Sequence, residues 1–255
     1  MTVPVLSVIR DSYGVLARHP RASIVCLGKG LLAIAAIILV TIGLTITANG
    51  VAGSAMGQGP LPTLIAGVAL LAIALVMICV QTSFIRLAYF GANARMGLRF
   101  AAEERATVRA YFKLFLLQSI VIIALMLPCA LLAWLAHVMT GGNMPPYLSV
   151  PLVLICGLLF LWVNGRVYPI WPAAAVGQSL TLREAYELSR GNGWRIVLAV
   201  LPNLLLLGLL ASLQKSSLGA KPAVILLSVL LNIVILVTLS TALGSLYKHL
   251  SPPRD

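Results

Sequence analysis

Charged residues are scarce in this chain, and acidic residues are the scarcest. Only 9% of the 255 residues are charged and only 6 are acidic, whereas an ordinary globular domain carries about 25% charged residues. In contrast, 60% of the residues are hydrophobic. A soluble protein could not hide that much apolar surface, so the composition excludes an ordinary soluble domain.

Residues that carry out catalysis or bind metals are also few. The chain has 3 histidines, and no metal-binding motif surrounds His19, His137 or His249. The 4 cysteines all fall inside apolar stretches and none is in C-x-x-C spacing, so we interpret them as small core residues. No nucleophile motif and no glycine-rich phosphate loop is present. We therefore expect no enzymatic activity, no cofactor and no metal site.

Apolar stretches take up most of the chain. Each is close to the roughly 20 residues that a helix needs to cross a bilayer. They cover residues 22–48, 61–85, 114–138, 148–170, 196–213 and 223–247. We predict an all-α polytopic membrane protein that forms a single domain, with its six transmembrane helices arranged in three hairpins.

Positive charge is concentrated in the connections on one side of these stretches. Apart from Lys29, Lys215 and Lys221, every basic residue lies before the first stretch, between the second and third, at or after the end of the fourth, or after the sixth. All 6 acidic residues fall in the same connections. The positive-inside rule places these connections, and with them both termini, in the cytoplasm.

Amphipathic segments precede the first, third and fifth stretches. Before the first, apolar residues recur at helical spacing and predict a helix on the inner leaflet: Val5, Leu6, Ile9, Tyr13 and Leu16. Before the fifth, Thr181-Leu182-Arg183-Glu184 forms a capping box, and the helix is expected to end at Gly191-Asn192-Gly193. The middle segment, residues 100–111, keeps only the charge pattern.

The first and last of these segments are similar in sequence. Arg10-Asp11-Ser12-Tyr13 matches Arg183-Glu184-Ala185-Tyr186, which suggests a threefold internal repeat over residues 1–86, 87–173 and 174–250. Parallel repeats related by an axis along the membrane normal are known in membrane proteins. The alternative is chance similarity between amphipathic segments.

Two motifs resemble a known family. They are Ser7-Val8-Ile9-Arg10-Asp11 and the run from Trp171-Pro172-Ala173 through Glu184-Ala185-Tyr186-Glu187-Leu188-Ser189-Arg190 to Trp194. With these motifs the chain resembles the YciC-type inner-membrane proteins and the membrane domain found with some glycerophosphodiester phosphodiesterases. The resemblance implies six spans in the bacterial inner membrane and no established reaction. The phosphodiesterase catalytic domain of the related proteins is not found in this sequence, so we do not expect its activity here.

The basic connections suggest a role at the lipid surface. Each surface base contributes roughly 1 kcal/mol with acidic headgroups, so anionic lipid is the expected partner. Nucleic acid is not expected, since no aromatic-and-basic motif is present. Our main hypothesis is a lipid-associated scaffold or accessory or assembly subunit, with a membrane-protein partner or a second copy. The simpler interpretation is that the bases only set the topology. The candidate contact residues are Arg10, Arg18, Arg21, Arg183, Arg190, Trp194 and Arg195.

The alternative function is a small-solute or lipid transporter. Its site would use polar groups in the spans, namely Lys29, Asn164, Arg166 and Asn203. Prolines are expected to interrupt the third span at Pro128 and the fifth at Pro202. No acidic residue lies inside a span, which disfavours proton or sodium coupling. Amides such as Gln118 are explained equally well as contacts between helices.

Overall fold

Long apolar helices dominate the computed structural model, in which residues 3–52, 60–94, 102–140, 146–215 and 222–251 are described. The long helices are α2 (Pro20–Ala52), α3 (Pro60–Phe90), α4 (Ala102–Thr140), α5 (Pro146–Val167), α8 (Gly193–Lys215) and α9 (Pro222–Leu250). Each of these 6 helices contains a segment long and apolar enough to cross a membrane. Within the described residues there is no strand. The predicted all-α chain with six candidate spans is confirmed.

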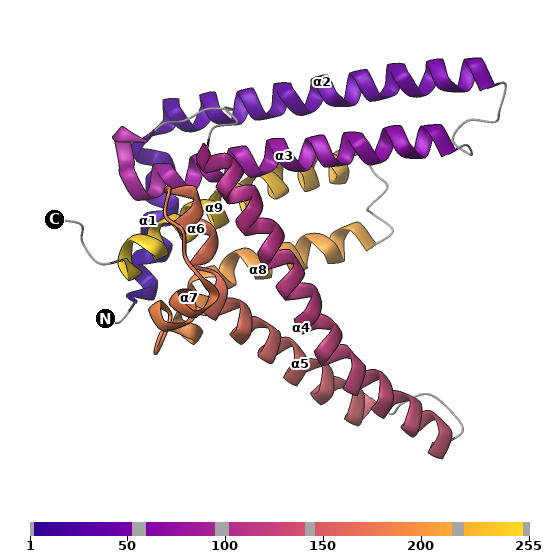
Figure 1. The fold of residues 1–255 in the computed structure, drawn as a ribbon, viewed down its shortest axis with the longest axis vertical. Coiled ribbons are helices and arrows are strands. Elements are labelled where there is room, and N and C mark those ends of the chain that lie inside the picture. The colour runs from indigo at the N-terminus through magenta and orange to yellow at the C-terminus, as the bar shows by residue number, and fades with distance from the viewer. Residues whose placement is uncertain (1–2, 53–59, 95–101, 141–145, 216–221, 252–255) are drawn as a thin grey trace.

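The long helices fan out from one end of the molecule, where both termini lie (Figure 1). The short helices α1 (Val5–Arg18), α6 (Ile170–Ala175) and α7 (Leu182–Leu188) and the 3-10 turn η1 (Gly91–Asn93) also lie at this end. We call it the basal end. From there α2 and α3 run together in one direction, α4 and α5 run together in another, and α8 and α9 lie between them. The tightest packing is therefore at the basal end.

A buried ion pair joins three elements at the basal end. Arg86 of α3 donates from Nη1 to Oε1 of Glu104 on α4 over 2.7 Å, and from Nε to the carbonyl oxygen of Ala175, the last residue of α6, over 2.6 Å. Arg86 is 8% exposed and Glu104 is 2% exposed. The expectation that these residues belong to a surface connection is wrong. Each lies inside a long helix, at the level where α3, α4 and α6 meet.

A glycine allows close approach between α3 and α9. A Cβ atom at Gly244 of α9 would overlap the carbonyl oxygen of Ile85 and would lie 2.8 Å from the Cβ of Ala88. Ile85 and Ala88 are themselves buried on α3. Since a backbone carbonyl cannot move without moving the helix, only glycine permits this contact.

The middle amphipathic segment is not a separate surface helix. From Ala102 onward it forms the first turns of α4, which continues without a break to Thr140. Over its 39 residues α4 extends about 58 Å, more than a bilayer core of about 30 Å requires. The predicted interruptions at Pro128 and Pro202 are also wrong, because α4 and α8 run through them as continuous helices.

The N-terminal amphipathic helix forms, and it packs on the bundle through a face that the pattern did not indicate. α1 buries Val8, Ser12 and Val15, and Thr241 of α9 donates its hydroxyl to the carbonyl oxygen of Ser12 over 2.9 Å. The predicted apolar face lies about a quarter turn away. Leu6 on that face is 83% exposed. α1 is thus anchored to protein on one side and keeps exposed apolar side chains on another.

The first prediction concerns the buried ion pair. Glu104→Gln keeps the shape of the side chain and removes the buried carboxylate charge that Arg86 contacts over 2.7 Å, which we expect to cost about 3–5 kcal/mol of folding free energy. The control is Glu187→Gln, which breaks the exposed pair with Arg183 and should change stability by less than about 1 kcal/mol. Thermal unfolding in detergent compares the two. Equal melting temperatures for both variants would contradict the role of the buried pair.

The second prediction concerns the contact between α3 and α9. Gly244→Ala should destabilise the protein by about 1–3 kcal/mol, the usual cost of overpacking. Gly67→Ala is the matched control on α3, because a Cβ there meets nothing within 4 Å. The control should leave the stability unchanged or raise it slightly, since alanine is the better helix former. A Gly244→Ala protein as stable as the control would show that the two helices are not in close contact.

Candidate functional site

Exposed basic side chains lie at the basal end and on the first turns of the helices that leave it. They come from α1, from the starts of α2, α4 and α8, from α7 and its C-terminal turn, and from the end of α9. We call this set the basal rim: Arg10, Arg18, Arg21, Arg105, Arg109, Lys113, Arg183, Arg190, Arg195 and Lys248. All the basic residues predicted to face lipid or a partner are members, and Trp194 beside them is 49% exposed. The structure therefore brings these residues to one end of the molecule.

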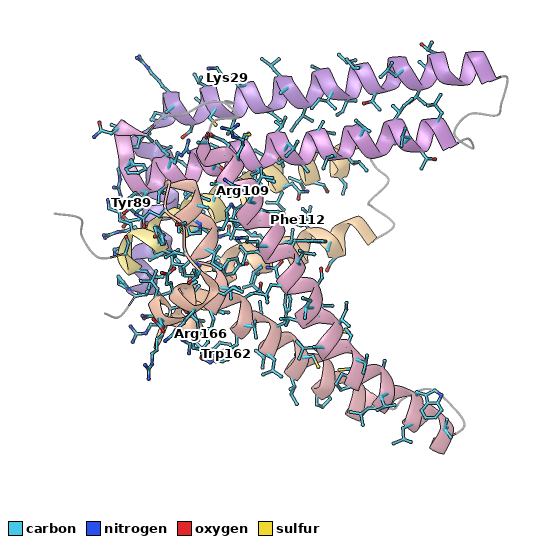
Figure 2. The ribbon with its side chains drawn as sticks, viewed as in Figure 1. Lys29, Tyr89, Arg109, Phe112, Trp162 and Arg166 are labelled. Carbon is cyan, nitrogen blue, oxygen red and sulfur yellow. The ribbon has the colours of Figure 1, made fainter. Side chains whose placement is uncertain are left out.

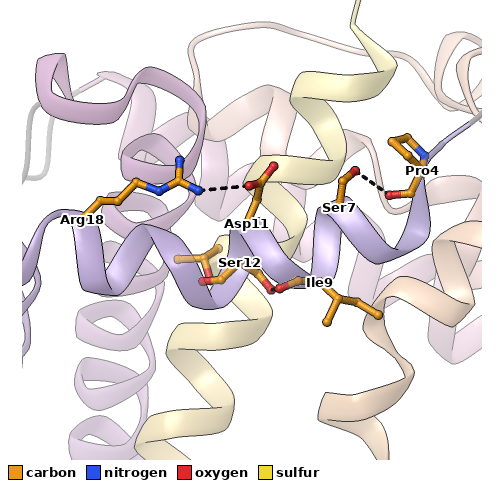
Figure 3. Close-up of polar contacts among 7 residues, drawn as sticks. Pro4, Ser7, Ile9, Asp11, Ser12 and Arg18 are labelled. Atoms are coloured by element: carbon orange, nitrogen blue, oxygen red, sulfur yellow. Dashed lines mark hydrogen bonds and ion pairs between the residues drawn. The ribbon is translucent and has the colours of Figure 1, made fainter.

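Two members of the basal rim form ion pairs that leave them accessible. Nη2 of Arg18 lies 3.1 Å from Oδ1 of Asp11, which is also on α1, and the Arg18 side chain is 62% exposed (Figure 3). Nε of Arg183 lies 3.0 Å from Oε1 of Glu187, and the Arg183 side chain is 89% exposed. Exposed pairs of this kind contribute about 0.2–1 kcal/mol, so an anionic ligand could replace the carboxylate at little cost.

Two cavities open within the basal rim. One, of about 390 Å³, is lined by Arg109, Lys113 and the segment Gly177–Leu180 between α6 and α7. The other, of about 350 Å³, is lined by Arg18, His19 and Arg21 at the turn from α1 to α2. Both combine basic groups with apolar walls. This combination suits an anionic headgroup with an apolar attachment.

The capping box predicted for the last amphipathic segment is confirmed. The backbone N–H of Thr181 donates to Oε2 of Glu184 over 2.7 Å, and the backbone N–H of Glu184 donates to the Thr181 hydroxyl oxygen over 3.2 Å. The backbone N–H and the hydroxyl of Thr181 lower the pKa of Glu184. The bonds that the Glu184 carboxylate accepts are therefore present at neutral pH and weaken as the pH falls through this lowered pKa, whereas the bond from the Glu184 N–H does not depend on that charge. Gly191 has φ 78°, which closes the turn as expected.

One basal-rim arginine also has a structural contact. Arg195 donates from Nη1 to the carbonyl oxygen of Val3 over 3.3 Å, and the N–H of Val3 donates to Oδ1 of the buried Asn192 over 2.9 Å. The start of α8 thus holds the N-terminal segment in place. Substitution of Arg195 would disturb this contact as well as the surface charge, so it is a poor probe of lipid binding.

The residues proposed for a transport site lie in different settings. Lys29 is exposed on α2, while Arg166 lies on α5 on the other side of the fold (Figure 2). Asn164 accepts a hydrogen bond from Nε2 of Gln118 and so links α5 to α4, and Asn203 accepts one from the Thr238 hydroxyl and links α8 to α9. These two amides form contacts between helices, as the simpler interpretation predicted.

Arg166 connects α5 to α7. Its Cζ lies 5.2 Å from the centre of the Trp162 ring and 4.8 Å from the centre of the Tyr186 ring. Its Nη1 donates to the carbonyl oxygen of Ser189 over 3.1 Å, and the Ser189 hydroxyl donates back to the carbonyl oxygen of Arg166 over 3.0 Å. These contacts hold the guanidinium between α5 and α7, while its Nε is buried without a hydrogen-bond partner among the described residues.

A third cavity, which the sequence did not indicate, lies where α4 crosses α6. Its volume is about 200 Å³. Aromatic rings and one amide form most of its wall, and the lining residues are Tyr111, Leu114, Phe115, Gln118, Tyr168 and Trp171. In the sequence, Trp171 belongs to a family motif and Gln118 is an isolated amide within a span. The residues are far apart along the chain, so no local pattern could have grouped them.

Cys129 of α4 and Cys156 of α5 are neighbours in space, with their Sγ atoms 3.0 Å apart. Both are free thiols. We predict that a membrane-permeant oxidant will join them and remove two of the 4 thiols from maleimide labelling of the denatured protein. Cys129→Ser should abolish this loss, whereas Cys26→Ser should not. Unchanged labelling after oxidation would contradict the pairing of α4 with α5.

Comparison with family models, with curated proteins and with solved structures finds no match to this chain. The functional assignment therefore rests on the basal rim, its cavities and the fold.

Proposed function

We propose that this chain is a non-enzymatic protein of the bacterial inner membrane, of the YciC type, that binds anionic lipid through the basal rim. In this proposal the basal end, with both termini, faces the cytoplasm. The protein acts as a lipid-associated scaffold, or as an accessory or assembly subunit of a membrane complex. The observation that carries the proposal is the gathering of exposed bases at one end of a fan of apolar helices.

The distribution of the acidic groups supports a cationic surface. Glu104 is buried against Arg86 and so contributes no negative charge to the basal rim. Asp11, Glu184 and Glu187 are at this end as well, but the basic side chains around them are more numerous. Each exposed base contributes about 1 kcal/mol of attraction to an acidic bilayer surface.

The exposed apolar side chains next to the basal rim support the same role. Leu6 and Tyr13 on α1, Leu182 and Tyr186 on α7, and Trp194 at the start of α8 are all at least 42% exposed. Apolar and aromatic groups beside bases are typical of helices that insert into the headgroup region. α1 and α7 would thus place apolar side chains in the bilayer and arginines at its surface.

The test is lipid retention by the intact protein. The variant Arg10→Ala/Arg183→Ala/Arg190→Ala should retain several-fold less phosphatidylglycerol relative to phosphatidylcholine in native mass spectrometry from mixed nanodiscs, and the difference should shrink at high salt. The control compares two single variants. Lys29→Ala removes one base outside the basal rim, and Arg10→Ala removes one base within it. Equal lipid ratios for the triple variant and the unmodified protein would overturn the proposal.

A separate purification distinguishes a scaffold from a subunit. Purification in mild detergent without cross-linking should yield the protein with anionic lipid alone if it is a scaffold. A second protein in fixed stoichiometry would identify an accessory or assembly role.

A further inference from the structure

The larger cavity of the basal rim has two basic residues in its wall. Its volume is about 390 Å³, and both Arg109 and Lys113 of α4 line it. The two side chains are exposed, and no hydrogen bond or ion pair joins either of them to another residue that the structure describes. No aspartate or glutamate is among the described lining residues. Within the described part of the chain, the cavity therefore presents two positive charges without a counter-charge.

The spacing of the two bases suits one doubly charged group. Arg109 and Lys113 are four residues apart on α4, so their Cβ atoms lie about 6 Å apart on one face of the helix. Two long side chains that start this close together can contact the same anion. A phosphomonoester carries a charge of about −1.5 to −2 at neutral pH and has three acceptor oxygens. A carboxylate or a phosphodiester carries a single negative charge and would leave one of the two bases unmatched.

The connection from α6 to α7 forms another part of the wall, and hydrogen bonds hold it in place. The backbone N–H of Gln178 donates to the carbonyl oxygen of Ala173 over 2.8 Å, and the side-chain oxygen of Gln178 accepts from the hydroxyl of Tyr247 on α9. The exposed hydroxyl of the adjacent Ser179 forms no hydrogen bond with a described residue. A wall that is fixed before the ligand arrives lowers the entropy cost of binding, and Ser179 adds a free donor to it.

The rest of the cavity is apolar. The remaining lining residues with apolar side chains are Ala102, Ala106, Ala110, Ile170, Ala174 and Leu180. A free phosphate ion would leave this part of the wall in contact with water, whereas a phosphate ester with an apolar attachment would cover it. The wall thus favours an ester over the bare ion.

We infer that this cavity binds a phosphomonoester group, with Arg109 and Lys113 as its charge partners and Ser179 as a hydrogen-bond donor. The inference rests on the proposed function, because it gives the anion-binding surface one specific site and one class of ligand. A lipid with a terminal phosphate and a soluble phosphate ester both carry this group. The experiment therefore has one arm for each source.

The first arm offers the protein two lipids with the same acyl chains. Nanodiscs of phosphatidylcholine contain equal amounts of dioleoyl phosphatidic acid, a monoester, and dioleoyl phosphatidylglycerol, a diester. Native mass spectrometry measures which lipid stays bound. The unmodified protein should retain phosphatidic acid about tenfold more than phosphatidylglycerol, the effect of one additional charge-assisted contact.

Two double variants of equal charge locate the preference. Arg109→Gln/Lys113→Gln should bring the ratio of phosphatidic acid to phosphatidylglycerol close to one. Arg10→Gln/Arg190→Gln removes the same charge from exposed residues of the basal rim that do not line this cavity, and it should leave the ratio unchanged. All four side chains are exposed, so both variants should keep the melting temperature of the unmodified protein.

The second arm tests a soluble ligand. Equilibrium dialysis of radiolabelled inorganic phosphate against the protein in a neutral detergent should show binding that Arg109→Gln/Lys113→Gln loses and Arg10→Gln/Arg190→Gln keeps. Phosphate binding without a preference for phosphatidic acid would identify a soluble ester as the ligand. The preference without phosphate binding would identify the lipid.

The outcomes separate this inference from the proposed function. Failure of both arms overturns the phosphomonoester site, and so does an equal response of the two double variants, which would show that only the total charge matters. Either result leaves the preference for phosphatidylglycerol over phosphatidylcholine untouched. Absence of that preference, with a phosphatidic acid preference that depends on Arg109 and Lys113, would overturn the basal rim as a general lipid surface and retain the site.

Discussion

The ion pair between Arg86 and Glu104 is the contact on which the basal end depends. A cation and an anion withdrawn from water are stable only when each satisfies the other, and the position of Arg86 is further fixed by the carbonyl oxygen of Ala175. One side chain therefore sets the distance between α3, α4 and α6. The cavity near Trp171 lies beside this junction, since α4 and α6 form its walls.

The fan shape follows from where the packing is concentrated. Close contacts such as that of Gly244 with α3 occur near the basal end, while farther out the helices separate and expose large apolar side chains such as Leu39 and Trp134. Among them is an apolar cavity of about 290 Å³ between α2, α3 and α9. In a bilayer these surfaces carry no hydrophobic penalty, because lipid tails cover them as well as another helix would.

Most polar side chains within the helices are occupied by structural contacts. Asn164 and Asn203 join neighbouring helices, and Arg166 is held between aromatic rings and a carbonyl oxygen. The exposed bases of the basal rim, in contrast, remain accessible to a ligand.

The sequence by itself determined the six apolar helices, the connections in which the bases are concentrated and the capping box at Thr181. Length, apolar composition and local hydrogen bonding depend only on neighbouring residues. It did not show that Arg86 and Glu104 are buried, since their pairing depends on α3 and α4 meeting. It also did not show that α1 packs on α9 through a second face, because that contact forms only where Thr241 meets Ser12. The sequence could not predict the Trp171 cavity for the same reason. Its residues come from α4 and from the α5–α6 segment, at least 50 positions apart, and only the tertiary structure brings them together.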